Sequence, residues 1–226
     1  MPRKMRVTLE LGPKGKKVVA VAPDWPGLER GGPTAEAATE KLWSYVPRYT
    51  EVAGRAGLGD ELGQLRGVDV VEEYEGTGST DFWGISFGFS SLDSHMTGAE
   101  LARQLELMRA CWSVFDDVRA RVSPEMQKGP RGGGRDRDEI ARHVVFTEQS
   151  FAKKLGIVTP EHAIVTDEGA LFAFRSEYCK KVMAFHKEKK AARTWPLRYL
   201  LRHTAYHAMD HIWEMEDKDL SRSATA

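Results

Sequence analysis

Histidines near the end of the chain follow a helical spacing. His203, His207 and His211 are four residues apart, so on an α-helix they form one stripe, which Glu214 continues. Two imidazoles at i and i+4 can point at one position, which is why His-x-x-x-His recurs in metal sites. His207 and His211 border the apolar face of the expected helix, whereas Arg202 falls on its charged back. The pair is therefore a candidate metal site at the rim of a helical core, beside the ordinary interpretation as two edge residues.

A third histidine is placed in the same way on another expected helix. His143 lies just off the edge of the apolar face of residues 136–155. One such histidine is usually an ordinary edge residue, but three from two helices could meet at one point. Three protein ligands would leave coordination positions open for water or substrate, which is the catalytic pattern. A metal there lowers the pKa of a bound water or thiol and makes it nucleophilic near neutral pH.

Four amphipathic helices are expected after residue 97. A capping box of Thr97 and Glu100 opens the first, and Asp136 with Glu139 opens the second, which Gly156 ends. Asp167 or Thr166 can cap the third, and Thr194 with Pro196 starts the fourth. The four helices are predicted at about 97–122, 136–155, 167–187 and 194–217. Their length and patterning predict an all-α up-down four-helix bundle.

The residues before this region have a mixed character. Strands are predicted at 6–11, 17–22, 68–74 and, as a short piece, 28–32. A helix follows Thr34, and Pro47 should kink or interrupt it. The order β-β-β-α-β indicates a small N-terminal module, so the chain as a whole is predicted to be α+β.

Aromatic residues occur in the segment that joins the two parts. Residues 76–96 contain Phe82, Trp83, Phe87 and Phe89 among glycines and serines. A free linker would not carry so many rings, so we expect seam packing between the modules or a pocket wall. The predicted division is a module at 1–75, a linker at 76–96, a bundle at 97–218 and a tail at 219–226.

The N-terminal module resembles the HicB-like antitoxin fold. The resemblance lies between Val18 and Tyr49, in Pro26-Gly27, the Gly31-Gly32-Pro33-Thr34 corner and the Ala-Glu-Ala-rich helix. It implies this fold over about residues 5–75, with Pro47 as a departure. It also implies a partner-recognition module, although no DNA-reading helix with clustered basic residues is visible.

Residues 97–218 resemble the DinB-like family of four-helix bundles, which includes thiol-dependent transferases. The matching motifs are residues 140–144 (IARHV) and 202–217 (RHTAYHAMDHIWEMED). The resemblance implies a divalent metal, zinc or nickel, held by His143, His207 and His211. His203 falls outside the matched positions, so it is interpreted as a group that supports the site or lies on the surface. An error in register would exchange its role with that of a ligand. The family also implies a homodimer.

Three functions follow from these features. The resemblance implies a metal-dependent transferase in which a low-molecular-weight thiol attacks an electrophile, so the partner is a thiol or another small-molecule substrate. A metal-dependent hydrolase that uses metal-bound hydroxide is a second reading. The third is a non-catalytic binding or regulatory protein with a HicB-like partner-recognition module.

Other polar residues have ordinary interpretations beside functional ones. Glu214 can serve as a base or orient a metal ligand, and its ordinary interpretation is a solvated carboxylate at a helix end. Asp210 can pair with an arginine or an imidazole. His95 is expected to cap the first long helix, with a position facing the pocket as the alternative. Arg131 and Arg135 lie in a glycine-rich loop that is expected to be solvated, with binding of an anionic cofactor group as the alternative. Cys111 and Cys179 are expected to be buried thiols rather than nucleophiles.

The amino-acid composition argues against several other classes of protein. Of 226 residues, 33 are lysine or arginine and 33 are aspartate or glutamate, so no net charge recruits nucleic acid. No apolar run reaches the roughly 18–20 residues that span a bilayer, so no membrane partner is expected. Two distant cysteines give no disulfide framework, which favours a cytoplasmic protein.

Overall fold

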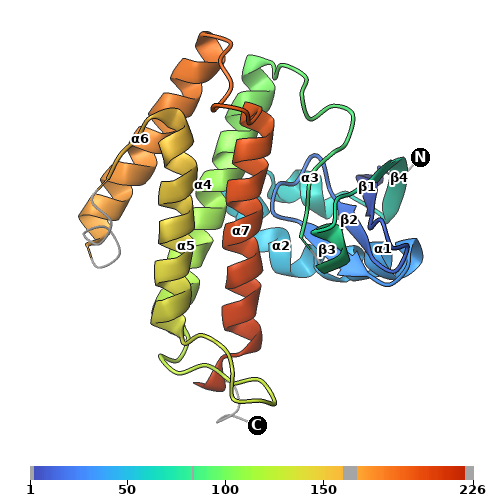
Figure 1. Cartoon of the computed structure of the whole chain (residues 1–226), viewed down its shortest axis with the longest axis horizontal. Coiled ribbons are helices and arrows are strands. Elements are labelled where there is room, and N and C mark those ends of the chain that lie inside the picture. The colour runs from blue at the N-terminus through green and yellow to red at the C-terminus, as the bar shows by residue number, and fades with distance from the viewer. Residues whose placement is uncertain (1–2, 83, 160–166, 222–226) are drawn as a thin grey trace.

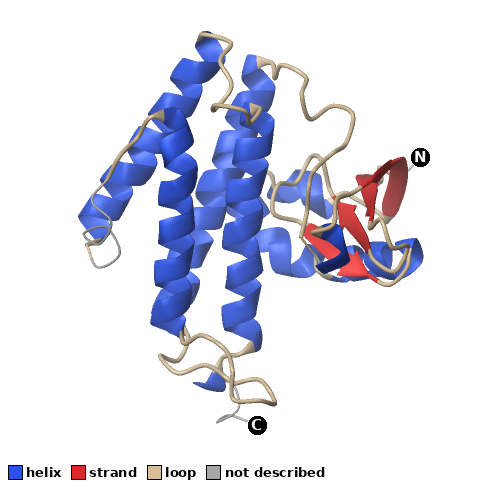
Figure 2. Cartoon of the chain, in the orientation of Figure 1, coloured by secondary structure: helices blue, strands red, loops and turns tan. Residues whose placement is uncertain are grey.

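The computed structural model describes residues 3–82, 84–159 and 167–221, and it has a mixed α/β fold. A four-stranded sheet near the N-terminus lies beside long helices (Figures 1 and 2). The described residues contain seven α-helices. None of the described helices is both long and apolar enough to cross a membrane. Trp83 and Thr166, singled out above, and residues 222–226 of the predicted tail lie outside the described residues.

The sheet has the strand order β3-β2-β1-β4. Its strands are β1 (Met5–Leu11), β2 (Val18–Val21), β3 (Glu29–Gly32) and β4 (Val68–Glu75), close to the predicted ranges. β1 pairs antiparallel with β2 and parallel with β4. Side chains alternate across the sheet, so Val7 and Leu9 face the main core, while Glu10 lies on the opposite face with Val19 and Val21.

Three short helices follow the sheet hairpin: α1 (Ala35–Ser44), α2 (Val46–Arg55) and α3 (Gly59–Gly63). Thr34 caps α1 as predicted, because its hydroxyl accepts a hydrogen bond of 3.1 Å from the Ala37 N–H. Pro47 lies in the first turn of α2, and the predicted interruption is confirmed. At Gly32, a Cβ would lie 2.4 Å from the Ala38 nitrogen, so only glycine lets β3 approach α1 this closely.

Four long helices form the other part: α4 (Gly98–Arg121), α5 (Arg137–Ala152), α6 (Glu168–Lys187) and α7 (Leu197–Asp217). Figure 1 shows them side by side. Thr97 and Glu100 make the predicted capping box of α4, and Asp167 caps α6. α7 begins at Leu197 rather than at Thr194, because Ala192 and Trp195 pair in a tight turn just before it.

The predicted strict up-down alternation is wrong. Figure 1 shows that α5 and α6 run in the same direction, opposite to that of α4 and α7. The number of residues between the two helices permits this, since a chain of 12 residues, as from Gly156 to Asp167, can reach up to about 40 Å, whereas the 16 residues of α5 span only about 24 Å.

Residues of both parts share one hydrophobic core, which contains Leu9 of β1, Leu42 of α1, Phe115 of α4 and Ile212 of α7. A second cluster fills the seam between the other sheet face and α7. Phe87 and Phe89 lie there against Val19 and Val21, with Tyr199 and Tyr206 at its edge. The seam packing that these rings predict is confirmed, except that Phe82 is exposed.

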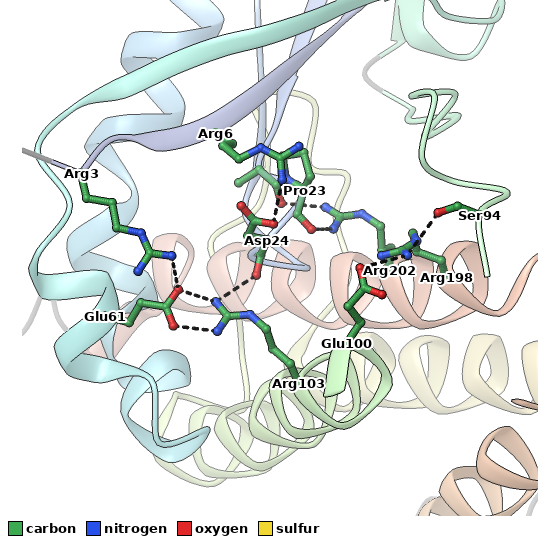
Figure 3. A network of polar contacts seen from close by, with 11 residues as sticks. Arg3, Arg6, Pro23, Asp24, Glu61, Ser94, Glu100, Arg103, Arg198 and Arg202 are labelled. Carbon is green, nitrogen blue, oxygen red and sulfur yellow. Dashed lines mark hydrogen bonds and ion pairs between the residues drawn. The ribbon is translucent and has the colours of Figure 1, made fainter. Parts of the chain in front are cut away.

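A network of arginines also joins the sheet module to the long helices (Figure 3). Arg103 of α4 donates to Glu61 of α3 at 2.8 Å. Arg202 is fully buried, where it donates to the Glu29 carboxylate at 2.7 Å and to the carbonyls of Ala22 and Pro23. The prediction that Arg202 lies on a charged back of α7 is wrong, because the β2–β3 connection covers that side of the helix.

The Glu10 carboxylate holds the aromatic segment on the sheet. It is buried, and it accepts hydrogen bonds from the hydroxyls of Thr80 and Tyr74 and from the backbone N–H groups of Ser86 and Phe87, all between 2.6 and 3.0 Å. An acceptor-only carboxylate can satisfy all four donors, whereas an amide cannot.

We therefore expect Glu10→Gln to lower the free energy of unfolding by about 3 kcal/mol, because it leaves buried donors unpaired. Urea denaturation measures this loss. Glu73→Gln, at an exposed position of β4, is the matched control and should change stability by less than about 0.5 kcal/mol. Equal effects of the two substitutions would contradict the role given to Glu10.

Candidate metal centre

The three predicted ligands lie together between α5 and α7. His143 projects from α5 and His207 and His211 from successive turns of α7, and each offers one nitrogen within 4.8 Å of the others. The Nε2 atoms of His143 and His207 are 3.1 Å apart. The structure thus brings three histidines close enough to hold one metal ion.

Glu214 fixes the orientation of one of these rings. Its carboxylate accepts a hydrogen bond of 2.7 Å from His211 Nδ1 and a second, of 2.6 Å, from the Lys218 ammonium. The bond to His211 is the main reason why the pKa of Glu214 falls to about 2. The bond occupies His211 Nδ1 and leaves Nε2 for a ligand. A carboxylate that holds a histidine in this way is a common support of metal sites.

The electrostatics of the cluster keep the imidazoles of His207 and His143 in the form that binds metals. Burial, reinforced by the neighbouring His211 and His143, lowers the pKa of His207 to about 2. Burial also lowers the pKa of His143. A neutral imidazole has a free nitrogen lone pair, which metal coordination requires.

The donor set fits a divalent ion that prefers nitrogen ligands. Three imidazoles suit zinc or nickel, and within residues 3–82, 84–159 and 167–221 no fourth histidine, cysteine or carboxylate joins them. Three protein ligands leave room for a further one from solution, which is the pattern of catalytic rather than structural sites.

His203 does not belong to this set. Its ring stacks on Tyr199 at 5.3 Å between centroids and touches Phe87, Phe151 and Trp195 edge-on or at a tilt. Burial lowers its pKa to about 4. His203 is therefore part of the aromatic seam, one turn away from the metal cluster.

A cleft of about 440 Å³ adjoins the site on the neighbouring face of α7. Glu214 forms part of its wall, together with Asp210 and aromatic rings. The guanidinium of Arg30 is the most prominent group in it, because it lies 4.1 Å from the ring centroid of Tyr45 and 3.5 Å from that of Trp213. Nothing in the sequence around Arg30 indicates this position, since Tyr45 lies at the junction of α1 and α2 and Trp213 lies on the distant α7.

The other residues considered from the sequence have separate locations. Asp210 pairs with Arg30 at 3.7 Å, in keeping with an arginine partner. His95 does not cap α4, since Thr97 does, and it stacks on His186 instead. Arg131 and Arg135 are exposed, although the charge of Arg135 contributes to the lowered pKa of His143 and His207.

Neither cysteine is a candidate nucleophile. Burial raises the pKa of the Cys111 thiol well above its ordinary value and raises that of Cys179 as well. Both thiols are therefore protonated near neutral pH. Any thiolate chemistry at this site must use a thiol from solution.

We expect Glu214→Gln to weaken zinc affinity by about 10–100-fold without abolishing it, because the amide holds His211 less firmly. Competition against a fluorescent zinc chelator measures the change. Asp217→Asn removes a carboxylate one turn further along α7 and serves as the control, with affinity close to the parent. Equal affinities of the parent and Glu214→Gln would show that the carboxylate does not support the site.

Protein-family models, curated proteins and solved structures were compared with the chain, and none of them matches it.

Proposed function

We propose that the chain is a divalent-metal-dependent transferase that joins a low-molecular-weight thiol to a small electrophile. In this proposal α4 to α7 form a four-helix bundle of the DinB-like type, and the ion is zinc or nickel. The observation that carries the proposal is the convergence of three imidazoles with a carboxylate behind His211. Such a site is built to bind an ion and keep part of its coordination sphere accessible.

The residues of the chain have distinct roles in this proposal. His143, His207 and His211 would hold the ion, and Glu214 would keep the His211 ring in place. When bound, a divalent ion stabilises a thiol as its thiolate near neutral pH. Because the pKa of Glu214 is about 2, this carboxylate stays ionised and supports an orienting role rather than that of a general base.

The adjoining cleft supports a small molecule as the partner. Its volume of about 440 Å³ lies in the range of ordinary ligand pockets. Trp213 and Tyr45 offer apolar surface, and charged groups of both signs line the cleft, with Arg30 and Lys41 beside Asp210 and Glu214. In the transfer, a carbon–sulfur bond forms, the bond from that carbon to its leaving group breaks, and the thiol proton passes to solvent.

The test begins with metal content. Elemental analysis of protein purified without a histidine tag, before and after reconstitution with zinc or nickel, should give close to one ion per chain. The loaded protein is then incubated with low-molecular-weight thiols and an alkyl halide, and the loss of free thiol is followed. Metal-dependent consumption of both reactants supports the transferase.

Two other outcomes identify the alternatives. Metal-dependent hydrolysis of an ester without any thiol would indicate the hydrolase instead. Stoichiometric metal without turnover of either substrate would leave a binding or regulatory protein. Absence of metal after reconstitution would overturn the proposal.

A further inference from the structure

The connection between α4 and α5 lies at the end of the molecule where α5 begins and α7 ends (Figure 1). It is tied to the end of α7, since the Gln127 N–H donates to the Lys218 carbonyl at 2.8 Å. A second hydrogen bond of 2.8 Å, from the Gly129 N–H to the Gly133 carbonyl, closes its glycine-rich part. This loop is exposed, but it is anchored beside the two helices that carry the candidate metal ligands.

Arg135 has a fixed place in this connection and an uncommitted side chain. The Lys128 ammonium donates to the Gly134 carbonyl at 3.2 Å and to the Asp136 carboxylate at 2.6 Å. The residues on both sides of Arg135 are therefore held. Arg135 itself is exposed, and its guanidinium has no hydrogen-bond or ion-pair partner among the residues that the structure describes. It can therefore bind an acceptor from solution.

His143 is directed towards the same end of α5. It lies seven residues after the N-cap Asp136, which places the two on one face of the helix and about 10 Å apart along its axis. Side chains of a helix lean towards its N-terminus, so the His143 ring leans towards Arg135. The charge of Arg135 accordingly contributes to the lowered pKa of both His143 and His207. The guanidinium thus lies within electrostatic range of two of the three candidate ligands.

The metal centre has little negative charge of its own. Its three imidazoles are uncharged donors when they bind a metal, and the carboxylate of Glu214 is already shared between His211 and Lys218. A divalent ion beside the Arg135 guanidinium would therefore favour a ligand that carries two negative charges. A thiolate supplies one of them. A carboxylate suits the second position, because a guanidinium binds it through two parallel hydrogen bonds.

We propose that Arg135 binds the carboxylate of the thiol substrate and so selects small thiols that carry an acidic group. The inference rests on the proposed function, in which the metal centre holds the sulfur. Arg135 is a specificity-determining residue in this arrangement, because it contacts the substrate away from the atoms that react.

The test measures thiol binding rather than turnover. Protein loaded with cobalt(II) is titrated with 3-mercaptopropionate and, in parallel, with 2-mercaptoethanol, which lacks the carboxylate. The charge-transfer absorption between thiolate and cobalt gives the Kd of each thiol. In the parent protein, 3-mercaptopropionate should bind about tenfold more tightly than 2-mercaptoethanol, as expected of one charge-assisted pair.

Variants separate a direct contact from the general field of the loop. Arg135→Gln should weaken the binding of 3-mercaptopropionate about tenfold and that of 2-mercaptoethanol much less. Arg131→Gln removes the same charge from another exposed position of the loop and should retain the preference. Arg135→Lys should restore part of it, because an ammonium pairs with a carboxylate without the two parallel hydrogen bonds.

Two results with the variants would overturn the proposal. A preference that survives in Arg135→Gln would indicate that the carboxylate coordinates the ion instead, and equal losses in Arg135→Gln and Arg131→Gln would indicate a general field. Equal affinities of the two thiols in the parent would contradict the role of Arg135 alone. Absence of the absorption with both thiols would contradict the proposed transferase, and this inference with it.

Discussion

His207→Ala is expected to lower divalent-metal affinity by more than about 100-fold, beyond the range that loss of a supporting residue produces. The three candidate ligands are evenly spaced, since the ring centroid of His207 lies 5.0 Å from that of His143 and 4.7 Å from that of His211, and the latter two are 4.9 Å apart. Removal of the His207 ring leaves two imidazoles on different helices. Elemental analysis of the purified variant should give close to zero ions per chain, and chelator competition gives the affinity.

His95→Ala is the matched control for this substitution. His95 is exposed and is not part of the metal cluster, so the variant should retain parental metal content. Circular dichroism and thermal unfolding in the presence of a chelator show whether His207→Ala still folds. A folded His207→Ala variant that keeps one ion per chain would refute the assignment of the ligands.

Arg202→Met is expected to have the largest effect on stability. The substitution leaves the fully buried Glu29 carboxylate without its ion-pair partner and frees two backbone carbonyls. Loss of one member of a buried pair usually costs about 3–5 kcal/mol. Urea denaturation at pH 8 measures the change in the free energy of unfolding. Glu29→Gln/Arg202→Met should recover part of the loss, because a neutral amide is less costly to bury than a carboxylate.

The same pair predicts how stability depends on pH. Burial raises the pKa of Glu29 to about 7, above the ordinary value of 4.5. The native state therefore binds this proton more tightly than the unfolded state does. The contribution of the Glu29 carboxyl group to the free energy of unfolding is complete below about pH 4.5 and is lost as the pH rises towards 7. Glu29→Gln should flatten this part of the pH profile, and an unchanged slope would contradict the raised pKa.

Local signals explain why the secondary structure could be predicted. The caps at Thr34, Thr97 and Asp167 act on N–H groups within three residues, so the sequence carries them directly. The break at Pro47 has the same local origin. The direction of α6 carries no such signal, because it depends on how the long helices pack rather than on the residues near their ends.

The candidate site was only partly visible in the sequence. The i and i+4 spacing places His207 and His211 on one face, but which helix lies opposite is a matter of tertiary packing. The pattern of residues 136–155 singled out His143, the family resemblance implied that it joins the pair, and the structure places it beside them. The Arg202–Glu29 pair escaped prediction because its members are 173 residues apart and arginine is usually exposed.

The long separation of Glu29 and Arg202 has a consequence during synthesis of the chain. Ribosomes add about 5–20 residues per second, so Glu29 is made roughly 9–35 s before its partner. Throughout that interval the carboxylate must remain hydrated, and the strands around it cannot reach their final burial. A nascent chain stalled before α7 should therefore expose the β2–β3 hairpin to proteases and chaperones, and translation of α7 should protect it.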